Sequence, residues 1–175
     1  GINVTEPLIQ HAKEIGIEVI GDIELFARNV NVKSNIVAIT GSNGKSTVVS
    51  LLGEMAQKCG INVGIGGNIG TPALDLFLQA KDLYILELSS FQLETITSLQ
   101  PKVAAVLNVS PDHLDRHAGF NEYKNAKLSI YNLAENIVYN VDDANTYPAE
   151  GKYNSHANIF SFSINEYNKK NLINT

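Results

Sequence analysis

The chain has 175 residues, of which 44% are hydrophobic and 18% charged, so it can bury the core of one ordinary domain and lacks the composition of a disordered protein. Its formal net charge of −5 argues against a surface that binds nucleic acid or an anionic membrane, but it leaves room for a local basic pocket that holds phosphate. The single cysteine, Cys59, excludes an internal disulfide and fits a reducing cytoplasm, and no apolar run reaches the ~18–20 residues of a membrane span.

The first 35 residues differ in pattern from the rest of the chain. We predict a helix over 7–15, a short strand over 17–20 and a helix through residue 29 that Asp22 caps. The polar stretch 29–35 is typical of a joint between folded segments. These residues therefore indicate the end of a preceding domain followed by a linker helix.

From residue 36 onward, predicted strands and helices alternate. The predicted strands cover 36–40, 61–65, 83–88, 103–107 and 137–139. The predicted helices cover 45–58, 72–79, 91–99 and 121–135, and the first of them places Val48, Leu51, Leu52 and Met55 on one face. Alternation at these lengths predicts an α/β fold, a P-loop-type three-layer domain with a mostly parallel sheet flanked by helices.

A glycine-rich loop lies between the strand over 36–40 and the helix that follows it. Glycines let backbone N–H groups turn toward an anion, and the helix N-terminus adds partial positive charge. A lysine can then bind the terminal phosphates, and an adjacent hydroxyl can ligate Mg²⁺. The loop is two residues shorter than the usual P-loop pattern, with Ile39 where the first glycine would stand. The alternative is a turn whose lysine is merely solvated. The residues concerned are Gly41, Ser42, Asn43, Gly44, Lys45, Ser46 and Thr47.

Polar residues follow the ends of the other predicted strands, where ligands bind in open α/β sheets. They are Asn68 with its flanking glycines, Glu87 with Ser89, and Asn108 with the run 112–117. Because strand ends are neighbours in a parallel sheet, we expect these clusters to converge. Glu87 is the most informative, since a carboxylate in an apolar strand is costly unless it is paired or binds a metal. A salt bridge to a helix lysine and a frayed, solvated strand end are the alternatives.

Two histidines, His113 and His117, are four residues apart and would share a helix face, as zinc ligands do. Leu114 stands where a metalloprotease would have glutamate and no third ligand is evident, so we disfavour a zinc hydrolase. We interpret His117 as lying at the margin of a surface ion-pair turn formed by Asp112, Asp115 and Arg116. A neutral His113 beside Glu87 could instead complete a Mg²⁺ shell.

Several motifs occur in an order that resembles the Mur ligases. They are Thr40-Gly-Ser-Asn-Gly-Lys-Ser-Thr47, Gly67-Asn-Ile-Gly70, Glu87-Leu-Ser-Ser-Phe-Gln-Leu-Glu94, Asn108-Val-Ser-Pro-Asp-His-Leu-Asp-Arg116, Tyr123-Lys-Asn-Ala-Lys127 and Asn140-Val-Asp-Asp143. The resemblance covers the chain to about residue 163, and its Glu-Leu-Ser-Ser-Phe-Gln-Leu-Glu and Gly-Asn-Ile-Gly forms are similar to those of the D-glutamate-adding members. The short phosphate loop is that family's normal form.

The resemblance implies an ATP-dependent amide ligase that activates a carboxylate as an acyl phosphate. It implies that Lys45 binds the β and γ phosphates, that Ser46 (or Thr47) and Glu87 ligate Mg²⁺, and that two Mg²⁺ sites exist. Asn68, Ser89 and His113 would contact the muramoyl substrate or the second Mg²⁺. Lys127 matches a lysine that is N-carbamylated in the family and then ligates Mg²⁺. From the sequence alone, Lys127 would be an ordinary solvated helix lysine. For Asn140 and Asp143 we hypothesise a role on the nucleotide side of the site.

The resemblance also implies partners and domains. The substrates would be UDP-N-acetylmuramoyl-L-alanine and D-glutamate, in a cytoplasmic enzyme of peptidoglycan precursor synthesis that acts as a monomer, without nucleic acid or membrane. Residues 1–22 would end an N-terminal UDP-binding domain, and 23–175 would form a truncated central ATP-binding domain whose C-terminal amino-acid-binding partner is absent. We expect this chain alone to be inactive. A different Mur-type or folylpolyglutamate-type ligase, or a non-catalytic nucleotide-binding module, remains the alternative.

Overall fold

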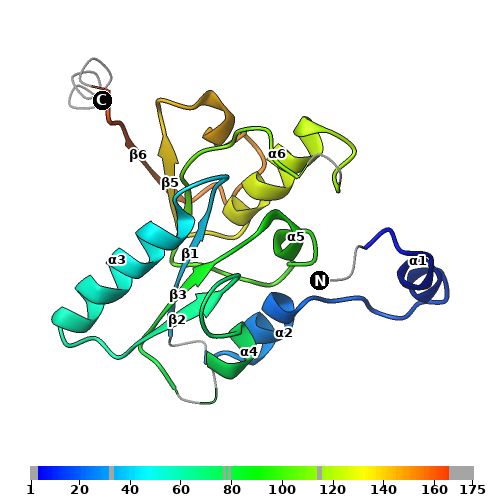
Figure 1. The fold of residues 1–175 in the computed structure, drawn as a ribbon, viewed down its shortest axis with the longest axis horizontal. Coiled ribbons are helices and arrows are strands. Elements are labelled where there is room, and N and C mark those ends of the chain that lie inside the picture. The colour runs from blue at the N-terminus through cyan, green and yellow to red at the C-terminus, as the bar shows by residue number, and fades with distance from the viewer. Residues whose placement is uncertain (1–3, 32–33, 77, 79, 114–115, 166–175) are drawn as a thin grey trace.

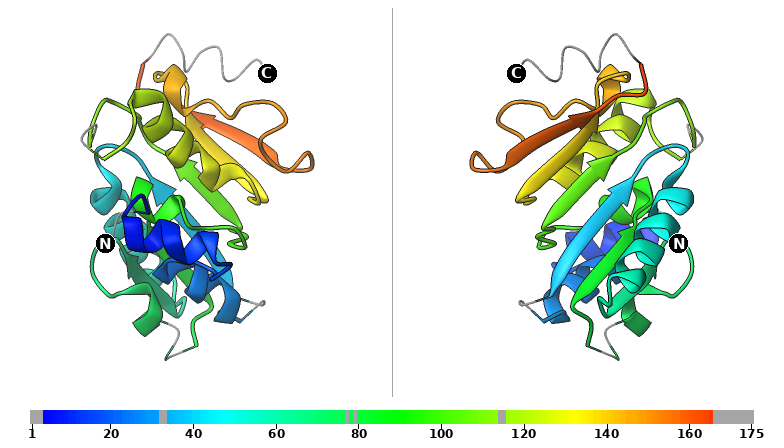
Figure 2. Two further views of the ribbon diagram at one scale, coloured as in Figure 1. Left: turned by 90° about the vertical axis from the view of Figure 1, so that its right-hand side faces the viewer. Right: turned by 90° about the vertical axis from the view of Figure 1, so that its left-hand side faces the viewer.

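The computed structural model describes residues 4–31, 34–76, 78, 80–113 and 116–165. Six parallel strands form one sheet in the order β2-β3-β1-β4-β5-β6 (Figures 1 and 2). Their bounds are Asn35–Thr40 for β1, Val63–Gly67 for β2, Leu83–Glu87 for β3, Val103–Val106 for β4, Asn136–Asn140 for β5 and Asn158–Phe162 for β6. The predicted α/β class and parallel sheet are therefore confirmed.

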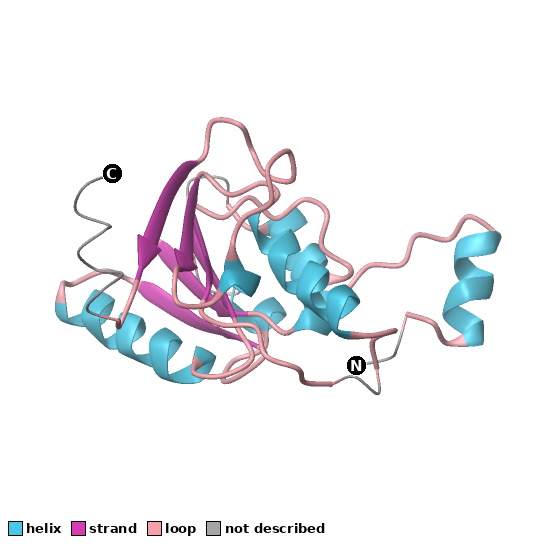
Figure 3. Ribbon diagram, turned by 90° about the horizontal axis from the view of Figure 1, so that it is seen from above, coloured by secondary structure: helices cyan, strands magenta, loops and turns pink. Residues whose placement is uncertain are grey.

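Helices cover both faces of the sheet (Figure 3). The α-helices are α1 (Pro7–Glu14), α2 (Asp22–Asn29), α3 (Lys45–Lys58), α4 (Ala73–Leu76), α5 (Ser90–Leu93) and α6 (Phe120–Leu128), and two 3₁₀ turns follow at Ser129–Tyr131 (η1) and Ala144–Thr146 (η2). Successive side chains of a strand point to opposite faces. Ala38 of β1 thus packs in the core under α2, α4, α5 and α6, whereas Ile39 packs with Val49 of α3.

The N-terminal prediction is partly wrong. Residues 17–20 form no strand, and Ile17 is exposed, because no neighbouring strand offers its backbone a partner. Asp22 is the first helical residue of α2 rather than its cap, which is Gly21. α1 has no buried residue and stands apart from the sheet (Figure 1). No helix in the described part of the chain is long and apolar enough to cross a membrane.

Four other elements differ from prediction by two residues or more. β2 lies at Val63–Gly67 rather than 61–65, and Ile61 is exposed. α4 ends at Leu76, with residues 77 and 79 outside the described part. The helix predicted over 91–99 stops at Leu93, because the next loop gives its N–H groups to Glu24 instead of continuing the helix. The helix predicted over 121–135 is replaced by α6 and η1.

The core face predicted for α3 is also wrong in part. Leu51 and Met55 are exposed, and the buried positions of this helix are Val49, Gly53 and Ala56. A Cβ at Gly53 would lie 2.0 Å from Cδ1 of Ile65, so the Ile65 side chain would have to move to admit it. Small residues therefore let α3 approach the sheet closely.

Candidate functional site

The phosphate loop joins β1 to α3 at the carboxyl edge of the sheet. Gly44 adopts a left-handed φ of 79°, which glycine tolerates without strain, and no described side chain caps the N-terminus of α3. The N–H groups of the first helical turn therefore have no capping side chain and can accept an anion. The Lys45 ammonium donates to the loop carbonyls of Gly41 at 2.9 Å and Ser42 at 3.2 Å.

Asn108, directly after β4, holds this loop in shape. Its carbonyl accepts from the Ser42 N–H at 2.9 Å, its side-chain oxygen accepts from the Asn43 N–H at 2.8 Å, and its side-chain amide donates back to the Asn43 carbonyl at 3.0 Å. A Cβ on Gly41 would lie 3.2 Å from Leu107 Cβ, so the loop approaches the end of β4 closely. The sequence predicted Asn108 at the carboxyl edge of the sheet, but no pattern in it indicated that Asn108 holds the phosphate loop in shape.

Glu87 ends β3 as a buried carboxylate, only 1% exposed. Ser46 donates its hydroxyl to one carboxylate oxygen at 2.8 Å, and the Asn68 amide donates to the other at 2.9 Å. In the described part of the chain Glu87 forms no ion pair with lysine or arginine, so both alternatives for this residue, a salt bridge and a solvated end, are wrong. The prediction that the strand-end clusters converge is confirmed for these three residues.

The oxygens of Ser46 and Glu87 fit a hard divalent cation. Hydroxyl and carboxylate oxygens are the ligands Mg²⁺ prefers, and both lie beside a loop built for phosphate. The buried carboxylate now satisfies its oxygens with neutral donors, which a cation could replace. Of the two hydroxyls of the motif, it is that of Ser46 that lies 2.8 Å from the Glu87 carboxylate, so the geometry favours Ser46 over Thr47 as the ligand.

Lys127 of α6 is 2% exposed, so its interpretation as a solvated helix lysine is wrong. Its ammonium donates to the Gly41 carbonyl at 2.9 Å and to the Thr40 hydroxyl at 3.5 Å, and it lies 4.7 Å from the centre of the Tyr123 ring. Burial and then the nearby charge of Lys45 lower the pKa of Lys127 to about 8. A larger fraction of its amine is therefore neutral, and hence nucleophilic, near neutral pH.

Neither Ser89 nor His113 forms a hydrogen bond with the buried Glu87 carboxylate in the described part of the chain. Ser89 caps α5 in a reciprocal pair with Gln92, so its hydroxyl is already engaged. His113 is exposed on the loop after β4, where it adopts a φ of 51° and its N–H donates to the Asp112 carboxylate at 2.9 Å. Its imidazole ring lies beside the Asp112 carboxylate and the Phe91 ring, and among the described residues it forms no hydrogen bond or ion pair with Glu87.

The interpretation of His117 as a surface residue is wrong, because it is buried against Ser90 and Phe91. Asp115 of the expected ion-pair turn lies outside the described residues, and Arg116 places its guanidinium 4.5 Å from the Phe91 ring centre. Among the described residues, no group of three or more His, Cys, Asp or Glu side chains could hold a metal ion. A zinc site at His113 and His117 therefore has no third such ligand there.

Asn140 and Asp143 hold the loop after β4 through internal hydrogen bonds. The Asn140 amide donates to the Leu107 carbonyl at 3.0 Å, and the Asp143 carboxylate accepts from the Val109 N–H at 2.7 Å. Within the site, Tyr123 is the residue that sequence reasoning missed, since its hydroxyl lies 2.9 Å from Ser42 Oγ. Its four-residue spacing from Lys127 on one helix face was the available signal.

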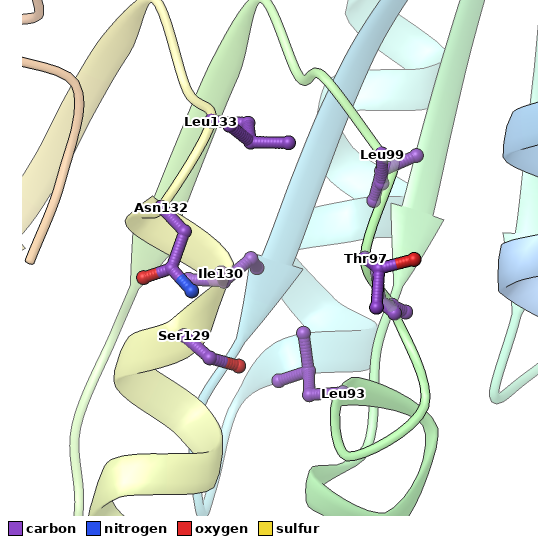
Figure 4. A pocket seen from close by; sticks show the side chains of 8 residues that line it. Leu93, Thr97, Leu99, Ser129, Ile130, Asn132 and Leu133 are labelled. Atoms are coloured by element: carbon purple, nitrogen blue, oxygen red, sulfur yellow. The ribbon is translucent and has the colours of Figure 1, made fainter.

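A cavity of about 320 Å³ lies elsewhere, between the loop after α5 and η1 (Figure 4). Its walls are mainly aliphatic and include Leu93, Leu99, Ile130 and Leu133. None of its lining residues belongs to the phosphate loop or contacts Glu87. The polar residues discussed above therefore form a separate site at the carboxyl edge of the sheet.

Comparisons with known proteins agree with this geometry. The family model of the Mur ligase middle domain matches residues 39–175. The chain is 57% identical over 148 residues to UDP-N-acetylmuramoylalanine–D-glutamate ligase of Haemophilus ducreyi, covering 85% of this chain and 34% of that protein. It is 52% identical over 166 residues to the ligase of the same name from Escherichia coli, covering 94% of this chain and 37% of that protein. The chain thus spans about a third of the length of these relatives.

Solved structures share the fold. The structure of UDP-N-acetylmuramoyl-L-alanyl-D-glutamate–2,6-diaminopimelate ligase superposes with a TM-score of 0.65 at 21% identity, covering 90% of this chain and 35% of that one. MurF ligase from Thermotoga maritima, in complex with ADP, gives a TM-score of 0.62 at 22% identity, covering 83% and 37%. At this identity the likeness establishes the architecture alone.

Proposed function

This chain belongs to the Mur ligase family, and from that premise we propose that it is the nucleotide-binding part of a ligase that joins D-glutamate to UDP-N-acetylmuramoyl-L-alanine with ATP. The observation that carries the proposal is the buried Glu87 carboxylate, bonded to Ser46 at the end of the phosphate loop and to Asn68. The two relatives named above, at 57% and 52% identity, support D-glutamate as the amino acid.

The proposed chemistry follows from a carboxylate being a poor electrophile. The γ-phosphoryl group of ATP passes to a carboxylate oxygen of the muramoyl substrate, releasing ADP and giving an acyl phosphate. The amine of D-glutamate then attacks the acyl carbon, and the tetrahedral intermediate expels phosphate as the amide forms. Negative charge accumulates in the first step, so positioned cations and N–H donors lower its barrier.

The residues of the site have distinct roles in this scheme. Lys45, which now spans the loop carbonyls, would exchange those contacts for the β and γ phosphates. Ser46 and Glu87 would hold Mg²⁺, which when bound neutralises phosphate charge. Asn68 would orient Glu87 and, with Ser89 and His113, face the muramoyl substrate or a second Mg²⁺.

Lys127 would carry a carbamate in the active enzyme. Its neutral amine would attack CO₂, lose a proton and become an anion that can ligate the second Mg²⁺. The pKa lowered to about 8 by burial supports this step, because only the neutral amine reacts. The 2.9 Å contact with the Gly41 carbonyl puts the nitrogen beside the phosphate loop, where such a ligand is useful.

We further propose that residues 1–22 end a UDP-binding domain, that 23–175 are part of the central ATP-binding domain, and that a separate C-terminal domain binds D-glutamate. Leu8, Ile15 and Ile17, in and just after α1, are exposed apolar side chains, and this supports the proposal that the UDP-binding domain covers them. The enzyme would be a cytoplasmic monomer that uses neither nucleic acid nor a membrane. The 175-residue chain alone would not ligate, and D-glutamate-dependent phosphate release from it would refute this.

The test uses the complete ligase with Mg²⁺–ATP and UDP-N-acetylmuramoyl-L-alanine. ADP release should depend on D-glutamate, with L-glutamate and meso-diaminopimelate as control amino acids, and should fall by about 10²-fold or more in Glu87→Gln. ADP release that depends instead on a folate substrate would favour the folylpolyglutamate type. ATP binding without any acceptor-dependent turnover would indicate a non-catalytic module and reject the proposal.

A further inference from the structure

His117 is a buried polar residue that the proposed chemistry does not use. Its Nε2 lies 3.0 Å from the hydroxyl of Ser90, and Nδ1 lies 3.3 Å from a carboxylate oxygen of Glu94 without the alignment of a hydrogen bond. An imidazole inside a core is costly unless its nitrogens are engaged. The Ser90 bond therefore fixes His117 to α5, immediately beside the capping residue Ser89.

The His117 ring also reaches the loop that carries His113. It stacks on Phe91 with ring centroids 5.3 Å apart and an interplanar angle of 8°. The same Phe91 ring lies 5.4 Å from the His113 ring and 4.5 Å from the Arg116 guanidinium. The Phe91 ring therefore contacts His117, the exposed His113 and Arg116.

His113 is held in a backbone conformation that non-glycine residues rarely adopt, with φ at 51°. Such a conformation persists only when its surroundings enforce it, and it often marks a functional position. The turn that enforces it closes on His117, since the His113 carbonyl accepts from the N–H groups of Arg116 at 3.0 Å and of His117 at 3.4 Å. The backbone of His117 is therefore part of the turn that holds His113.

The other side of His117 faces the phosphate loop through Tyr123. The two rings meet edge to face, with centroids 5.3 Å apart and an interplanar angle of 68°. The Tyr123 hydroxyl lies 2.9 Å from Ser42 Oγ, and the Tyr123 ring supports the Lys127 ammonium at 4.7 Å. His117 thus packs on a side chain that contacts both the phosphate loop and the buried lysine.

We propose that His117 is a positioning residue, which fixes the relative placement of His113, Lys127 and the phosphate loop through Ser90, Phe91 and Tyr123. It touches no substrate, and its effect passes through these neighbours. The inference rests on the proposed function, because it assigns a task within that same site. Misplacement of reacting groups by about 1 Å is enough to slow a reaction by about 10²-fold.

The test measures kcat and KM of the complete ligase and three variants. His117→Phe keeps a ring for stacking and removes both nitrogens, Ser90→Ala removes the partner hydroxyl, and His156→Phe makes the same chemical change at an exposed site. We expect His117→Phe and Ser90→Ala to lower kcat by about 10–100-fold with the KM for ATP within about twofold, because such supporting contacts orient reacting groups. His156→Phe should behave as wild type.

A merely structural role would give a different result. It would lower the folded fraction, while kcat per folded molecule matched that of His156→Phe, and this result would overturn the proposal. The double variant His117→Phe/Ser90→Ala should be no slower than the single variants, because each removes the same bond; additive losses would also contradict it. If His117→Phe does not fold, Ser90→Ala and His117→Gln, which returns a polar atom toward Ser90, decide the matter.

The outcome is separable from the proposed function. If the wild-type protein shows no D-glutamate-dependent turnover, the ligase assignment fails, and the crystal structure of folded His117→Phe tests positioning instead. We expect His113 to leave the positive-φ region and Phe91 to move in that structure. An unchanged His113 and Phe91 would overturn the proposal whatever the activity.

Discussion

Replacing Lys127 by methionine separates the stability of this domain from its chemistry. Burial, and then the charge of Lys45, lower the pKa of Lys127 from 10.5 to about 8. Because one pKa unit corresponds to about 1.4 kcal/mol, folding this residue as a cation costs roughly 3 kcal/mol. Methionine keeps much of the aliphatic stem and removes the charge, but loses the bond to the Gly41 carbonyl, which is worth about 1 kcal/mol. We therefore expect Lys127→Met to raise the free energy of unfolding by about 1–2 kcal/mol at neutral pH.

The sign of the pH dependence follows from the direction of this pKa shift. Below about pH 8 both the native and the unfolded chain carry the proton, so the cost of burial is fully present. Between about pH 8 and 10.5 the unfolded chain binds more protons at this residue, so native stability rises with pH. The variant lacks this rise, and its advantage over wild type should shrink across that range.

The assay is urea unfolding of both proteins in CO₂-free buffer, from neutral pH to about pH 10. Lys58→Met, an exposed lysine at the end of α3, serves as the matched control and should leave the stability difference near zero. A Lys127→Met chain that is less stable than wild type at neutral pH, or a difference that does not change with pH, would refute the reasoning. In the complete ligase the same variant should be inactive.

Three further predictions concern the surroundings of the site. Glu24→Ala should lower the free energy of unfolding by about 1–3 kcal/mol, because the buried carboxylate accepts from two backbone N–H groups that would lose their partner. Although desolvation raises the pKa of Glu24, its hydrogen bonds lower that pKa to about 2. The stabilisation by Glu24 should therefore be present above about pH 4.5 and be lost as the pH falls toward 2. Circular dichroism against urea and pH measures both effects. Gly67→Ala should destabilise the fold more than Gly60→Ala. Gly67 has a φ of 106° and a Cβ there would lie 2.4 Å from a backbone oxygen of β3, whereas a Cβ at Gly60 would face open space. Equal changes in melting temperature for the two variants would contradict this close approach of β2 and β3. Ser46→Ala should weaken Mg²⁺-dependent nucleotide binding more than Thr47→Ala, and calorimetry giving the reverse order would reassign the ligand.

The sequence predicted what depends on local pattern. The apolar run at β1, the glycines after it and the amphipathic start of α3 indicated the phosphate loop, and the carboxyl-edge rule brought Ser46, Glu87 and Asn68 together from the pattern alone. β6 was missed, because an edge strand buries only part of its side chains: Ile159 and Phe160 remain exposed.

Other features depend on contacts between distant segments. The early end of α5 follows from Glu24, more than 60 residues away in the chain, capturing the backbone of residues 97 and 98. The burial of Lys127 follows from α6 packing over the Gly41 carbonyl, and the burial of His117 from its bond to Ser90. Neither residue lies in an apolar run, so a local pattern could not distinguish it from a solvated side chain.

We propose that the loop between β1 and α3 holds the phosphates of ATP within a Mur ligase site. The most direct measurement is calorimetric titration of Mg²⁺–ATP into the complete ligase, beside Lys45→Ala and the exposed control Lys58→Ala. We expect saturable binding that Lys45→Ala weakens by about 10²-fold and that Lys58→Ala leaves intact. Binding of equal strength in all three folded proteins would mean that the phosphates lie elsewhere, and would contradict the proposed role of Lys45.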